Sequence, residues 1–83
     1  MPKFIDHHPM PQMPPEAMQQ MKQAAESGQA DPNGVIPHNV FVGKDGTAFC
    51  YTEAENTEAV IKSHASMGVT LTEEQITEVT SLL

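Results

Sequence analysis

The chain has 83 residues, one domain's length, and a formal net charge of −7 from four lysines, no arginine and eleven acidic residues. That balance excludes a surface built to bind phosphate backbones, which require clustered Lys and Arg, so we expect no nucleic-acid partner. No segment has the roughly 20 apolar residues of a membrane span, and no apolar signal sequence opens the chain, so we expect a cytoplasmic protein without a membrane partner.

The first third predicts a strand, a stiff loop and a helix. "PKFID" is read as a strand that continues to about His8. Four prolines then exclude regular structure over residues 9–15, and Pro14-Pro15 is typical of a helix start. An apolar stripe at helical spacing follows, made of Ala17, Met18, Met21, Ala24 and Ala25. Gly28 predicts the end of this helix, and we expect Met18 and Met21 to pack in the core.

Two strands joined by a tight turn come next. "VIPHNVFVG" (35–43) and "TAFCYTEA" (47–54) have strand composition, and Asp45-Gly46 between them is typical of a hairpin tip. Pro37 lies inside the earlier of these strands. Because proline cannot donate a ladder hydrogen bond, this strand is predicted to lie at a sheet edge or to contain a bulge.

A second helix is predicted from about Thr57 to Met67. Asn56 is a suitable N-cap, and Gly68 marks the helix end. The tail is ambiguous, because "TEEQ" at Thr72 resembles a capping box whereas "ITEVTSLL" (76–83) is rich in β-branched residues. We expect a short turn over residues 72–75 and then a final strand.

The resulting order is strand, helix, strand, strand, helix, strand. This is the ferredoxin-like βαββαβ pattern, an antiparallel sheet with two helices on one face. The other face needs a cover. A domain this small buries only about 60% of its unfolded surface, and Cys50 is the sole cysteine, so no internal disulfide adds stability. We therefore expect a homodimer in which the sheets of two copies pack face to face.

The hairpin places Cys50 relative to its neighbours. If Val42 pairs with Ala48, then Val40 pairs with Cys50, and strand parity puts His38 on the same face as the thiol. A slip of one residue in the register would separate His38 from Cys50. In the second helix, His64 follows Val60 by four residues and therefore lies on the apolar stripe.

The ferredoxin-like layout brings these groups toward one end of the sheet. His7 and His8 end the first strand beside the start of the third, and because they point opposite ways at most one joins the helix-covered face. The candidate metal ligands are therefore His38, Cys50, His64, His7 and His8. Imidazole and thiolate together suit zinc, nickel and copper. No CxxC or HExxH spacing accompanies them.

Each member also has an ordinary structural interpretation. A single strand cysteine is commonly a small buried hydrophobe, His64 is commonly a hydrogen-bonded core histidine, and His7-His8 can be solvated. Met10 and Met13 are soft donors, but loop packing is the favoured interpretation. Covalent catalysis by Cys50 is disfavoured, because no Gly-rich loop offers an oxyanion hole. Proton transfer by His38 with Glu53 is a more reasonable enzymatic alternative.

The pattern "PHNVFV…AFCYTEAENTEAVIKSHASMGVTLTEEQITEV" resembles a family of small bacterial and archaeal proteins of unknown function, some described as nickel-binding. The matching positions are His38, Cys50, Tyr51, Glu53, Ala54, Ala59, Val60, His64, Gly68, Ile76, Glu78 and Val79. The resemblance covers residues 35–80 and the opening "MPKFI", but not the Met/Pro loop or the doubled histidine. It implies a ferredoxin-like chain that dimerises as an α+β barrel, with His38, Cys50 and His64 as shared polar residues.

The sequence thus predicts a homodimeric protein that binds a divalent transition metal, nickel first and zinc or copper as alternatives, for buffering or sensing. Two other functions stay open. One is a cofactor-free isomerase or monooxygenase-like enzyme that uses the dimer cavity. The other is an interaction module without a site, in which the histidines are structural.

Overall fold

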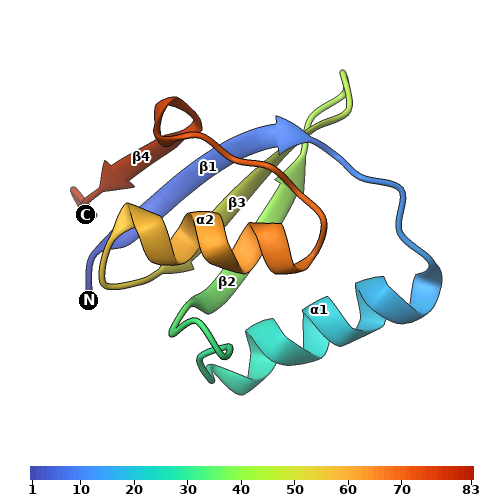
Figure 1. Cartoon of the computed structure of the whole chain (residues 1–83), viewed down its shortest axis with the longest axis horizontal. Helices are drawn as coiled ribbons and strands as arrows, with labels where there is room; N and C mark the ends of the chain where they lie inside the picture. The colour runs from blue at the N-terminus through green and yellow to red at the C-terminus, as the bar shows by residue number, and fades with distance from the viewer.

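The computed structural model describes all residues, 1–83, and has the predicted element order (Figure 1). The elements are β1 (Lys3–Pro9), α1 (Pro15–Ser27), β2 (Ile36–Val42), β3 (Thr47–Glu53), α2 (Thr57–Ser66), a short 3₁₀ helix (Glu73–Gln75) and β4 (Ile76–Val79). The four strands form one antiparallel sheet in the order β2-β3-β1-β4. This confirms the ferredoxin-like α+β fold, and it confirms β2 as an edge strand.

Helix α2 lies across one face of the sheet and closes the core (Figure 1). Asn56 caps it, since the Asn56 side chain accepts a 2.9 Å hydrogen bond from the amide of Ala59. The core beneath is a cluster of six buried apolar residues: Phe4, Val35, Ala54, Val60, Leu71 and Ile76. They come from β1, the loops and β4 as well as from α2, so this cluster ties both ends of the chain together.

Helix α1 is placed differently from α2. It lies to the side of the sheet, nearest β2, and none of its residues is buried (Figure 1). The expectation that Met18 packs in the core is wrong, because its side chain is 54% exposed, whereas Met21 is half-buried. Proline-rich residues 9–15 carry the chain away from the sheet before α1 begins at Pro15, which explains why only one edge of its apolar stripe finds a partner. The helix ends as predicted at Gly28, in the left-handed conformation with φ 68°.

The hairpin of β2 and β3 has the predicted register over most of its length. Val42 pairs with Ala48 and Val40 pairs with Cys50. The register shifts between Pro37 and Asn39, where β2 has a bulge. The bulge follows from the missing N–H of Pro37, and its extra residue, His38, is turned to the opposite face from the one that parity predicts.

The C-terminal strand is shorter than expected. Thr72 and Gln75 form a capping box around the 3₁₀ helix, and β4 then covers only Ile76–Val79. Val79 pairs with Lys3, the first residue of β1, so residues beyond it have no strand to pair with. The strand predicted over residues 80–83 is therefore wrong, and Leu82 and Leu83 are exposed.

The sheet face opposite α2 carries exposed aromatic side chains and is uncovered in a single chain. Phe41 pairs directly with Phe49 across β2 and β3, and these rings are 59% and 40% exposed. Tyr51 and Ile5 pair on the same face, one step further along. An apolar patch of this kind commonly marks an interaction surface.

Candidate metal centre

Four polar side chains meet beneath α2, in a region otherwise expected to be apolar. β1 supplies Asp6 and His8, which share the helix-covered face with Phe4. β3 supplies Cys50, which pairs with Asp6, and α2 supplies His64. All four are buried, with exposures of 0%, 5%, 8% and 4% respectively. One ligand atom from each lies within 4.8 Å of all the others. We refer to these four residues as the donor cluster.

Backbone carbonyls orient both imidazoles of the donor cluster. The Nδ1 atom of His64 lies 2.9 Å from the carbonyl oxygen of Val60, one helical turn earlier. The Nδ1 atom of His8 lies 2.8 Å from the carbonyl oxygen of Pro9. Because a carbonyl can only accept, each Nδ1 carries the proton and each Nε2 is directed at the other donors. Metal-bound histidines commonly have this outer hydrogen bond.

The Asp6 carboxylate is wholly buried and lacks hydrogen bonds. Its Oδ1 atom lies 3.2 Å from Nε2 of His64 and 3.6 Å from Nε2 of His8. These approaches fall outside hydrogen-bond geometry, so we treat them as ion-pair contacts, and neither carboxylate oxygen has a hydrogen-bond partner. A buried carboxylate left in this way is costly unless a cation compensates it.

The Asp6 carboxylate changes the pKa values of its neighbours in the ion-free donor cluster. Burial alone would lower the pKa of His64, but the adjacent Asp6 outweighs burial and raises it. Burial, reinforced by the negative charge of Asp6, raises the pKa of the Cys50 thiol to about 12. The ion-free state thus favours protonation of His64 more than an ordinary imidazole does, and it favours a protonated thiol at Cys50, whose Sγ lies 3.5 Å from Nε2 of His8.

The spacing of the donors fits a single small cation. Ligands bound to zinc at 2.0–2.3 Å in a tetrahedron lie roughly 3.4–3.8 Å from one another. The contacts of 3.2, 3.5 and 3.6 Å within the donor cluster are already close to that spacing. One carboxylate, one thiol and two imidazoles form a mixed donor set that borderline divalent metals accept.

A polar brace holds α2 over the cluster. The hydroxyl of Ser63, next to His64, donates to Oδ2 of Asp31. The Oδ1 atom of the same carboxylate accepts from the amides of Asn33 and Val35, at 2.8 and 2.9 Å. The link between α1 and β2 is thereby tied to α2 at the turn that carries His64.

Three of the five predicted ligands belong to the donor cluster: His8, Cys50 and His64. His7 is exposed on the opposite sheet face, where it pairs with Phe49. The bulge places His38 there as well, with its ring stacked on Tyr51 at a centroid distance of 4.9 Å and its Nε2 3.5 Å from Oε1 of Glu53. The predicted pair of His38 and Glu53 is therefore adjacent, but it is partly exposed and lies on the sheet face opposite the thiol.

Sequence reasoning missed Asp6. Its signal was strand parity, because Asp6 and His8 share a face with the apolar Phe4, whereas His7 shares the other with Ile5. Parity alone would also have selected His8 over His7.

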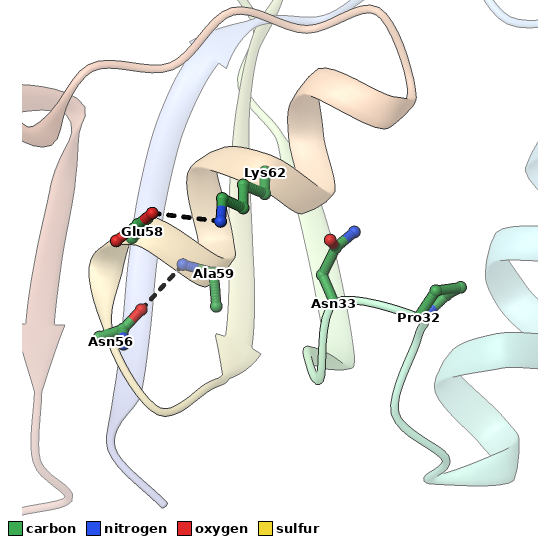
Figure 2. A pocket seen from close by; sticks show the side chains of 6 residues that line it. All are labelled: Pro32, Asn33, Asn56, Glu58, Ala59 and Lys62. Carbon is green, nitrogen blue, oxygen red and sulfur yellow. Dashed lines mark hydrogen bonds and ion pairs between the residues drawn. The ribbon is translucent and has the colours of Figure 1, made fainter.

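A hollow lies between α2 and the loop that links α1 to β2. It has a volume of about 280 Å³ and is bordered by Pro32, Asn33, Asn56, Glu58, Ala59 and Lys62 (Figure 2). Glu58 and Lys62 form an exposed ion pair of 3.1 Å across one helical turn, and Asn56 is already engaged as the helix cap. Its charged groups are thus paired on the helix surface, and the donor cluster stays the stronger candidate site.

Comparison with known proteins supports the fold. The chain is similar to SCO4226 from Streptomyces coelicolor A3(2), a crystal structure with 26% sequence identity and a TM-score of 0.67 over 98% of this chain and 99% of that chain. No family model and no curated protein matches the sequence. Neither helix is long and apolar enough to cross a membrane. The similarity to SCO4226 extends the ferredoxin-like assignment over practically the whole chain.

Proposed function

We propose that this protein binds one divalent transition metal ion, nickel first, through Asp6, His8, Cys50 and His64, and that it buffers or senses that ion. The observation that carries the proposal is the buried Asp6 carboxylate, which has no hydrogen bond and faces two imidazoles and a thiol. A metal ion in the middle would compensate the carboxylate and use both inward-facing nitrogen atoms.

Two considerations support nickel. The donor set combines oxygen, nitrogen and sulfur atoms, and for such a site Ni(II) binds more tightly than the earlier divalent metals of the first row. The sequence also resembles a family with nickel-binding members. Zn(II) and Cu(II) are the natural competitors. A cytoplasmic location would keep the single thiol reduced and able to bind metal.

Storage or sensing suits this geometry better than catalysis. All four donors are less than a tenth exposed, so the ion would sit beneath α2 with little room for a large substrate beside it. A buried site whose donors lie on two strands and a helix also links occupancy to the stability of the fold.

Metal binding should raise the melting temperature of untagged, chelator-treated protein. At free Ni(II) of 100 times Kd, the added stability is about 2.7 kcal/mol, which for a domain of this size corresponds to a shift of roughly 10 °C or more. Thermal denaturation in the presence of Ni(II), Zn(II) or Mg(II) measures this shift in melting temperature, and addition of EDTA should reverse the shift. An identical melting temperature in all of these solutions would rule out a metal-binding function.

We also propose a homodimer in which the open sheet faces of two copies pack together. The support is the exposed aromatic pair of Phe41 and Phe49, flanked by Tyr51 and Ile5. In a small domain with one compact core cluster, covering this face would add apolar burial that a single chain lacks.

Charging this face should dissociate the dimer. Phe49→Asp places a carboxylate against the partner sheet, so we expect sedimentation of a dimer for the natural protein and of a monomer for the variant at the same micromolar concentration. Met18→Asp, on exposed α1, is the matched control and should remain dimeric. A natural protein that sediments as a monomer at tens of micromolar would exclude this assembly.

A further inference from the structure

A pocket of about 100 Å³ lies directly beside the donor cluster, and His8, Cys50 and His64 form one of its walls. Four of the chain's six methionines line the same pocket. They are Met10 and Met13 from the loop after β1, Met21 from α1, and Met67 at the end of α2. Methionine side chains from three separate segments thus line the same pocket as Cys50 and the two imidazoles.

The loop that carries two of these methionines is restrained. Pro9, Pro11 and Pro14 fix the backbone on either side of Met10 and Met13. The amide of Met10 also donates a 2.9 Å hydrogen bond to the carbonyl of Gly46, which fastens the loop to the tip of the β2–β3 hairpin. A restrained loop loses little conformational entropy when its side chains bind a ligand.

The donors differ in softness from one side of the site to the other. Asp6, a hard oxygen donor, is wholly buried at the sheet and is not among the pocket-lining residues. Cys50 pairs with Asp6 across β1 and β3 and also lines the pocket, so it borders both the carboxylate and the methionine side chains. Thiolate and thioether donors select Cu(I), whereas carboxylate oxygens favour harder divalent ions.

We propose that the same centre also takes Cu(I), bound by Cys50 and the imidazoles with thioether donation from Met10 and Met13. This inference rests on the proposed metal-binding function and extends it to a monovalent, soft ion. The Cu(I) ion sits on the pocket side of Cys50, and the divalent ion sits closer to Asp6. The Cys50 thiol releases its proton to solvent as the Cu–S bond forms, and copper stays Cu(I) throughout.

The two ions should therefore depend on different residues. The double variant Met10→Leu/Met13→Leu keeps apolar volume but removes both thioethers, and it should lower Cu(I) affinity by roughly 10-fold or more while Ni(II) affinity stays within about twofold. Asp6→Asn should lower Ni(II) affinity by a larger factor than Cu(I) affinity. Met18→Leu, a methionine of exposed α1 outside the pocket, is the control and should change neither affinity.

Anaerobic competition of the reduced protein with a chromophoric Cu(I) chelator measures the first affinity, and calorimetry with Ni(II) measures the second. X-ray absorption should give more than one Cu–S bond in the natural protein and only one in the double variant. Unchanged Cu(I) affinity in a folded double variant, or no Cu(I) binding by the natural protein, overturns this inference even where Ni(II) binds. If the natural protein binds neither Cu(I) nor Ni(II), the proposed metal-binding function itself is overturned.

Discussion

Replacing Cys50 by serine is expected to lower Ni(II) affinity by more than about 100-fold, beyond the loss typical for residues that only support a ligand. Serine keeps a small buried side chain next to Nε2 of His8, at the position where Sγ lies 3.5 Å away. It cannot supply a thiolate, however, because a hydroxyl does not ionise under these conditions. Calorimetric titration of chelator-treated protein measures the loss, and a melting temperature without metal shows that the variant is folded.

A double-mutant cycle tests whether Cys50 and His64 serve one ion. His64→Gln should cause a similar loss, and the double variant should lose much less than the sum of the two, because the site is already disabled by either change. His38→Gln is the matched control, since this imidazole lies on the other sheet face beside Glu53. Strictly additive losses, or an equal loss from His38→Gln, would contradict a single site at the donor cluster.

Removing the charge of Asp6 should destabilise the metal-free protein strongly and in a pH-dependent manner. Breaking a buried ion pair on one side costs about 3 kcal/mol or more when the other charge remains. Asp6 raises the pKa of His64 in the folded state. The stabilisation that this pair contributes is therefore complete below the unfolded pKa of about 6.5 and is lost as pH rises through the folded pKa.

Asp6→Asn should consequently lose most stability near pH 6 and progressively less as pH rises through the folded-state pKa of His64. Urea unfolding with EDTA at pH 6 and pH 8 measures the difference. In the natural protein, stability should fall again above pH about 8.5, because the unfolded thiol ionises there whereas burial keeps the folded Cys50 protonated to about 12. Cys50→Ser should remove this alkaline limb. A loss in Asp6→Asn that is the same at both pH values would exclude the ion pair with His64.

Local periodicity was sufficient to predict most of the framework. The alternation of the strands, the Asp45-Gly46 turn and the Asn56 cap can each be recognised from a few neighbouring residues. The β2–β3 register was predicted from these local signals. The position of α1 could not be predicted in this way. Whether its apolar stripe is buried depends on where the preceding proline-rich loop places the helix relative to the sheet. The length of β4 likewise depended on the position at which its neighbour β1 begins.

The candidate site was predictable only where side-chain direction follows simple alternation. Cys50 and His64 were predicted from the faces of the strand and the helix on which they lie, and the structure confirms both faces. His38 did not join them, because one bulged residue reverses parity in β2. Asp6 was missed because an acidic residue in a strand is ordinarily expected at the surface. Its complete burial becomes understandable only once the structure places it beside the two imidazoles and the thiol of the donor cluster.

The donors come from the first strand, a middle strand and the last long helix, and this has a kinetic consequence. An emerging or refolding polypeptide has no local stretch that resembles the finished site, so tight capture of the ion must wait until β1 is inserted between β3 and β4 and α2 has docked. Binding of the ion would therefore require a completely assembled fold, and removal of the ion would loosen β1 and α2 together.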